Sequence, residues 1–126
     1  MSLLRHVPEV AALVNEFRSQ RLLDYGCGDG TQYSRERCHV VFGVDMPVLY
    51  EPGKALFSSL PTGQFDGVIC IDYLDTLAPD LVPEALAKIA WYARQWAFIA
   101  ARGEGWQEKI APFFRDDVRL VIRETK

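Results

Sequence analysis

The sequence has few of the features that mark membrane-spanning, nucleic-acid-binding or metal-binding proteins. Its 126 residues include no apolar run near the roughly 18 residues that a membrane-spanning helix needs. There is no basic run, and 14 basic against 17 acidic residues give a net charge of −3, so binding to a nucleic-acid backbone is not indicated. The cysteines lack metal-ligand spacing, so we expect no metal site and a reducing, cytoplasmic setting for Cys27, Cys38 and Cys70.

The composition that remains is typical of one globular domain. Apolar residues make up 49% of the chain and charged residues 25%, which is ordinary usage. A length of 126 residues lies within the roughly 100–200 residues of a usual domain, so residues 1–126 are expected to form a single domain. Near the N-terminus, Arg5 and His6 are followed by Pro8, Glu9 and only a brief apolar stretch, which predicts no signal peptide.

The order of apolar and polar segments predicts an α/β fold. Helices are expected at residues 8–19, 31–38, 80–94 and 104–114, and strands at 21–25, 65–71, 97–101 and 118–122. Two further strand candidates are 40–44 and 48–50, and the loop 52–65 contains one short strand candidate at 55–57. Strands that alternate with helices favour a mainly parallel sheet, in which ligands bind beyond the carboxyl ends of the strands.

The clearest local signal is the segment Leu22–Gly30, which reads L-L-D-Y-G-C-G-D-G. Glycines at alternate positions let the chain turn sharply and let a ligand touch bare backbone. The dinucleotide-binding fingerprint needs a further glycine where this chain has Thr31, and Asp29 puts a negative charge where a pyrophosphate would lie. Asp24, at the strand end, suits a ligand with a positive charge. A purely structural strand-to-helix turn is the alternative.

Leu22–Gly30 resembles motif I of the class I S-adenosylmethionine-dependent methyltransferases. Residues 65–72, F-D-G-V-I-C-I-D, resemble the family's fourth-strand segment, in which a Phe-Asp pair precedes an apolar strand. Together with Gln32-Tyr33 and residues 49–52, the motifs are similar to a small group of methyltransferase-like proteins common in phage and environmental sequences. The resemblance covers roughly residues 21–101. It implies a three-layer Rossmann-like sandwich with helices on both faces of a mainly parallel sheet, compact and truncated at its C-terminal end.

The same resemblance implies how S-adenosylmethionine would be bound. The backbone of Gly26, Cys27 and Gly28 would meet the methionine half, and Asp24 would hold its ammonium group. A carboxylate after the second strand would accept hydrogen bonds from both ribose hydroxyls. Asp45 and Glu51 compete for this role. Glu51 is favoured, because a strand ending at Asp45 leaves a very short helix for a crossover of about a dozen residues or more.

Other residues are implied as weaker cofactor contacts. Gly30 completes the glycine loop, and Ser58 and Leu60 fall where the family contacts adenine. Gln32 and Tyr33 either reach the methionine carboxylate and close the pocket or are surface residues in the first turn of a helix.

Asp72 and Tyr73 stand where the family has its catalytic or acceptor-facing residues. Asp72 either acts as a base toward the acceptor or holds the cofactor's amino group, and Tyr73 lines either the pocket or the core. The cofactor site is complete in the sequence and the acceptor site is not. We therefore expect a small-molecule or partner-presented acceptor, with a second copy or a partner protein completing the site. The alternative to a methyltransferase is a non-catalytic cofactor-binding module that regulates a partner or sequesters the cofactor.

Overall fold

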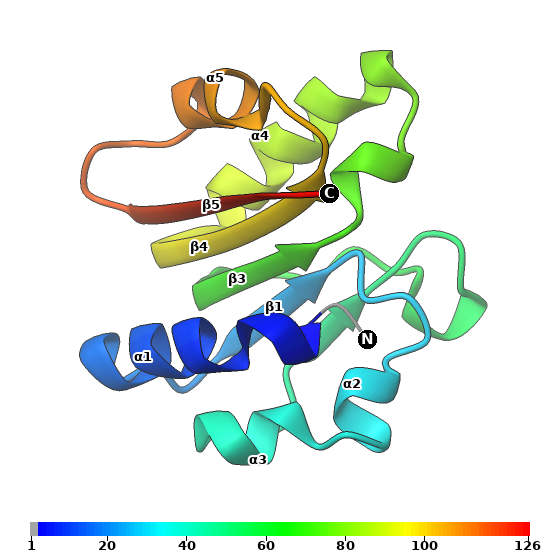
Figure 1. The fold of residues 1–126 in the computed structure, drawn as a ribbon. Helices are drawn as coiled ribbons and strands as arrows, with labels where there is room; N and C mark the ends of the chain where they lie inside the picture. Colours follow the sequence, from blue (N-terminus) through cyan, green and yellow to red (C-terminus); the bar gives the residue numbers. More distant parts are fainter. Residues whose placement is uncertain (1–2) are drawn as a thin grey trace.

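The computed structural model describes residues 3–126 and is built around a five-stranded sheet in which every strand is parallel to its neighbours (Figure 1). The strand order is β2-β1-β3-β4-β5. The strands are β1 (Leu22–Tyr25), β2 (Val48–Tyr50), β3 (Phe65–Ile71), β4 (Ala93–Arg102) and β5 (Arg119–Thr125). This is an α/β fold of the general Rossmann-like kind. The strand order reverses between β1 and β3, and parallel sheets bind ligands at such a point.

Helices pack against the sheet from two sides, and the strand order explains the faces of those helices that connect two strands, which excludes α1 (Val7–Phe17) because it precedes β1. Parallel crossovers are right-handed, so a connection that moves one way along the sheet lies on one face and a connection that moves the other way lies on the opposite face. Figure 1 shows two groups of helices, one on each face of the sheet. One face carries α1, α2 (Thr31–Ser34) and α3 (Cys38–Phe42), and the other carries α4 (Val82–Tyr92) and α5 (Trp106–Ile110). Short 3₁₀ turns are η1 (Leu3–His6), η2 (Ala55–Phe57), η3 (Leu74–Thr76), η4 (Pro79–Leu81) and η5 (Ala111–Phe113).

Each helical group has its own apolar cluster against the sheet. Val10 and Val14 of α1 pack with Phe98 of β4, whereas Leu86 and Ile89 of α4 pack in the other cluster. Because β3 and β4 are covered on both sides, they are nearly continuous apolar runs without alternation. The predicted strand at 65–71 is confirmed. Within residues 3–126, no helix is long and apolar enough to cross a membrane.

The strand predicted at 40–44 is wrong, because residues 38–42 form the helix α3. Cys38 and Phe42 lie one helical turn apart and are both buried in the cluster that contains α1. Val40 and Val41 face outward, and Gly43 ends the helix with a left-handed φ of 81°. The spacing of the two buried residues, four apart, is the helical signal that the β-branched pair concealed.

Other elements also differ from the prediction. The helix expected at 31–38 ends at Ser34, the one expected at 104–114 is α5 (Trp106–Ile110) followed by η5, and the strand expected at 118–122 is β5 (Arg119–Thr125). Residues 55–57 form the 3₁₀ turn η2 rather than a strand. Strand β4 begins at Ala93, directly after α4, so it is longer than the predicted 97–101.

The Phe65-Asp66-Gly67 segment has a structural role at the start of β3. The Asp66 carboxylate accepts hydrogen bonds from the backbone N–H groups of Gln20 (2.9 Å) and Arg21 (3.0 Å), which ties the start of β1 to β3. At Gly67, a Cβ atom would lie 2.1 Å from the indole ring of Trp96. That indole is itself fixed, because its Nε1 donates to Ser19 Oγ at 2.9 Å. Gly67 is therefore required by packing.

We predict that Gly67→Ala lowers the free energy of unfolding by about 1–3 kcal/mol, because the added methyl group must displace a buried indole. Denaturant unfolding would measure the change. As a control, Trp96→Leu is introduced both into the parent protein and into the Gly67→Ala variant. If the clash is the cause, the double variant loses less stability than the sum of the two single variants. Strict additivity would contradict this account of Gly67.

Candidate functional site

A cavity of about 330 Å³ opens where the carboxyl ends of β1, β2 and β3 meet. Its volume lies in the range of roughly 300–1,000 Å³ that small-molecule sites occupy. It also lies at the reversal of strand order, where the fold predicts a ligand. The lining residues are Leu3, Asp24, Gly26, Cys27, Gly28, Asp29, Thr31, Gln32, Glu51, Ile71, Asp72, Tyr73 and Thr76.

The glycine loop is held in place by its own backbone. The N–H groups of Gly26 and Cys27 both donate to Tyr50 O, at 2.7 and 3.1 Å, so the end of β1 is tied to the end of β2. Gly26 has a φ of 83°, and a Cβ atom there would lie 2.2 Å from the Tyr73 ring. Gly28 has a φ of 61° with no atom within 4 Å of the position of a Cβ, so its backbone borders open space. This is the bare backbone that a ligand needs for close approach.

Gly30 has a different place from the other two glycines. It begins α2 in a left-handed conformation, and its N–H donates to Cys27 O at 3.2 Å. A Cβ atom there would meet Leu49 at 3.1 Å, and Gly30 does not line the cavity. Its role is to turn the chain into α2.

Asp24 is the buried acid of the cavity. Its side chain accepts hydrogen bonds from Tyr33 Oη at 2.5 Å and Gln32 Nε2 at 3.2 Å. Burial raises the pKa of this carboxyl from 3.8 to about 6, although the two hydrogen bonds act in the opposite direction. Within residues 3–126, both side-chain hydrogen bonds that Asp24 accepts end on Oδ2. The other oxygen is left for a group that enters the cavity.

Gln32 and Tyr33 are not surface residues, although they lie in the first turn of α2. Their exposed fractions are 4% and 1%, and both side chains donate to Asp24. Gln32 also donates to Cys27 O at 3.0 Å and borders the cavity, whereas Tyr33 does not. The structure therefore gives them the task of orienting Asp24.

Glu51 and Asp45, the two candidates for the second acid, lie at different ends of β2. Glu51 directly follows β2 and lines the cavity; its Oε1 accepts from Gly28 N at 3.0 Å and its Oε2 from Gly53 N at 3.2 Å. Asp45 precedes β2, in a surface hollow beside Ser19 and Gln20. The structure brings Glu51, and not Asp45, to the glycine loop. A carboxylate has about four lone-pair sites, so Glu51 keeps acceptor capacity after these two bonds.

The segment after β2 lies partly over the glycine loop but does not bring the predicted adenine contacts into the cavity. Lys54 Nζ lies 2.7 Å from Asp29 Oδ1, and this exposed ion pair contributes little stability. Ser58 is exposed and donates to Ala55 O, and Leu60 is 46% exposed. Neither lines the cavity.

Asp72 follows β3 in an uncommon backbone conformation. Its φ is 55°, and its N–H donates to Ala100 O at 2.8 Å. A residue other than glycine in this region costs of order 1 kcal/mol, although Asp tolerates it better than most. Residues held in this way gather at functional sites, and Asp72 lines the cavity.

Tyr73 serves as both cavity wall and core, so the two alternatives for it coincide. It is 9% exposed, its ring lies edge-on to that of Tyr25 at 5.7 Å, and it covers Gly26. Burial raises its pKa to about 12. Burial likewise raises the pKa of the Cys27 thiol to about 12. The raised pKa values favour the protonated forms of both groups near neutral pH.

Several cavity residues were not anticipated from the sequence. Leu3 comes from η1, far along the chain from the glycine loop, and no local pattern predicts its position. Thr31 comes after the glycine loop and Thr76 comes after the apolar segment 65–72. Only the tertiary structure, in which the strand ends meet, shows that both residues line the same cavity.

Comparison of the chain with protein-family models, with curated proteins and with solved structures gives no significant match. The chemistry of the site is therefore argued from its own residues.

We predict that Asp24→Asn stabilises the fold at neutral pH. A carboxyl whose folded pKa is raised binds its proton more tightly when folded, so stability falls as pH rises from about 4 to about 6 and stays lower above that. Asn keeps an acceptor for Tyr33 and Gln32 without the buried charge. The gain at pH 7.5 is up to about 3 kcal/mol.

Denaturant unfolding of both proteins at pH 7.5 and pH 5 would measure this. The gain should shrink at pH 5, where Asp24 of the unsubstituted protein is mostly protonated. If the gain in stability of Asp24→Asn over the parent is smaller at pH 7.5 than at pH 5, the cost assigned to the ionised Asp24 is refuted.

Proposed function

We propose that this chain is a small S-adenosylmethionine-dependent methyltransferase with the compact three-layer sandwich of the class I family. One observation carries the proposal: a buried acid near the carboxyl end of β1, an open glycine loop and a second acid after β2 border a single cavity. Acid, bare backbone and acid in that order suit a ligand with a cation at one end and vicinal hydroxyls at the other. The resemblance of residues 22–30 and 65–72 to the family's motifs supports the same conclusion.

The residues fit the cofactor at both ends. Asp24 would hold the ammonium group through the oxygen that its neighbours do not use, and that cation would stabilise the ionised carboxyl. The space beside Gly28, which no side chain fills, admits the methionine portion. Glu51 would accept hydrogen bonds from the two ribose hydroxyls. A dinucleotide is disfavoured, because the chain has Thr31 where the dinucleotide-binding fingerprint needs a glycine.

The remaining cavity residues have simpler tasks. S-adenosylmethionine supplies a methyl group already activated by a sulfonium, so the protein mainly aligns the partners. Tyr73 forms the wall beside the glycine loop. Asp72, which borders the cavity, would take the proton that an acceptor hydroxyl or amine loses. The acceptor would be a small molecule or a group presented by a partner protein or a second copy.

The second candidate is a module that binds the cofactor without turning it over. The volume of the cavity favours it, since about 330 Å³ is at the lower end for a small-molecule site and one cofactor molecule would fill much of it. Formation of S-adenosylhomocysteine with a panel of hydroxyl, amine and carboxylate acceptors separates the two candidates.

Calorimetric titration tests the shared premise. We expect S-adenosylmethionine and S-adenosylhomocysteine to bind and NAD not to bind. Glu51→Gln should weaken binding about tenfold or more, because a charge-assisted hydrogen bond becomes a neutral one. Asp45→Asn, the matched control at the other end of β2, should leave the affinity unchanged. Equal effects of the two variants, or preferential binding of NAD, would sink the proposal.

A further inference from the structure

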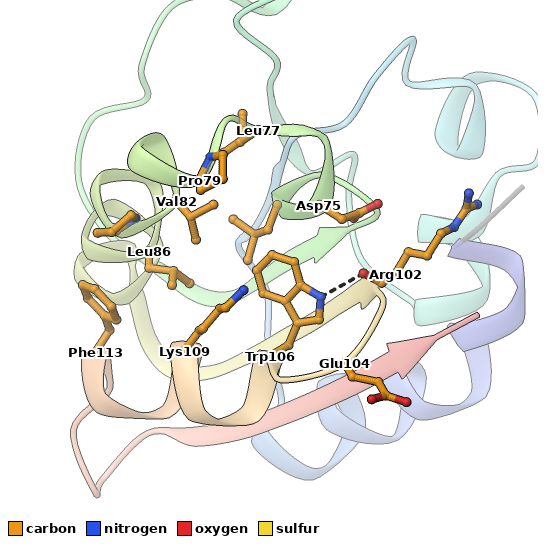
Figure 2. A pocket seen from close by; sticks show the side chains of 12 residues that line it. Asp75, Leu77, Pro79, Val82, Leu86, Arg102, Glu104, Trp106, Lys109 and Phe113 are labelled. Carbon is orange, nitrogen blue, oxygen red and sulfur yellow. Dashed lines mark hydrogen bonds between the residues drawn. The ribbon is translucent and has the colours of Figure 1, made fainter.

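A second and larger cavity, of about 560 Å³, lies between α4 and α5 (Figure 2). The turn η3 separates it from the first cavity, since Tyr73 and Thr76 line that one while Leu74 and Asp75 line this one. The proposed function does not use it. Its lining residues are Leu74, Asp75, Leu77, Pro79, Val82, Pro83, Leu86, Arg102, Glu104, Trp106, Lys109 and Phe113.

The centre of this cavity is apolar and well fixed. Val82 and Leu86 of α4 are 8% and 1% exposed, so their side chains are held by the core behind them. Trp106 is held at both its backbone and its ring: its N donates to Glu124 Oε2 at 2.6 Å, and its Nε1 donates to Arg102 O at 2.9 Å. Because the only polar atom of the indole is already satisfied, the ring offers a carbon surface to the cavity.

One positive charge lies over this apolar surface. Lys109 Nζ is 4.8 Å from the centre of the Trp106 ring, and Figure 2 shows it directed between that ring and Leu86. Lys109 makes no ion pair with any carboxylate within residues 3–126. Figure 2 shows Glu104 and Arg102 extending away from the cavity. The charge that faces a bound molecule is therefore positive at the Lys109 end.

The opposite end of the cavity disfavours a second anion. Asp75 lies there, and its Oδ1 is buried without a hydrogen-bond partner among the described residues. A molecule with a single negative group would therefore bind in one orientation. Its anion would lie at Lys109 and its apolar body between α4 and Trp106.

We infer that this cavity binds a small apolar monocarboxylate. Its volume suits a molecule of that class, and small-molecule sites combine mostly apolar walls with a few placed polar groups in this way. An apolar alcohol would gain the same burial without the ion pair, and an apolar amine would gain nothing from Lys109 and would have to bind in the reverse orientation, toward Asp75. This inference is independent of the proposed function, because the ligand is bound by a different set of side chains.

Calorimetric titration of the full chain, without S-adenosylmethionine, tests it with three matched probes: 4-phenylbutanoate, 4-phenylbutanol and 4-phenylbutylamine. We expect the carboxylate to bind about tenfold more tightly than the alcohol, and the amine to gain no affinity from Lys109. Lys109→Gln, at an exposed position, should remove the advantage of the carboxylate and leave the alcohol unchanged. Lys88→Gln is the matched control, because Lys88 pairs with Glu84 on α4 and does not line the cavity.

The variant Val82→Phe tests whether the probes bind inside this cavity, because Val82 lines it. The larger side chain should weaken all three probes by occupying their space, while circular dichroism reports whether the fold persists. Equal affinities for the three probes, equal effects of Lys109→Gln and Lys88→Gln, or undiminished binding to folded Val82→Phe would overturn the inference.

Discussion

The contact between the backbone of Gly26 and the ring of Tyr73 determines how the ends of β1 and β3 meet. No side chain can stand at residue 26, because a Cβ atom would lie 2.2 Å from that ring and φ is left-handed. Since Gly26 and Cys27 also donate to Tyr50 O, three strand ends are joined at one point. The cavity between Asp24, Glu51 and Asp72 exists because these ends are held together while the backbone of Gly28 stays uncovered.

Asp24 shows that this site is organised at a cost to stability. A carboxyl group that is buried prefers to be neutral, and burial raises the pKa of Asp24 to about 6. Tyr33 and Gln32 are buried to orient it, yet both use the same oxygen. A protein selected only for stability would have an amide or an apolar residue here. Retention of an oriented acid in a cavity is what a cation-binding site requires, and it links the energetics of the fold to the proposed cofactor.

The sequence predicted the parts of this site that depend on local patterns. An apolar strand that ends in Asp24 and glycines, and a second that ends in Asp72, are visible without any tertiary information. The choice between Asp45 and Glu51 was not settled, because β-branched Val40 and Val41 resemble a strand although packing of Cys38 and Phe42 makes the segment a helix. Leu3 was beyond prediction, since η1 reaches the cavity only through the tertiary fold. The positions of Ser58 and Leu60 could not be predicted correctly, because they lie in a loop whose sequence has no periodic pattern.

The most direct test of the central claim is an amide-resolved NMR titration of the chain with S-adenosylhomocysteine. The account predicts that shifts concentrate on Gly26, Gly28, Glu51, Gly53 and Asp72, with Gly43 and Val44, in the turn after α3, unchanged. Absence of shifts, or shifts centred on residues 43–45, would contradict a cofactor site at the joined ends of β1, β2 and β3.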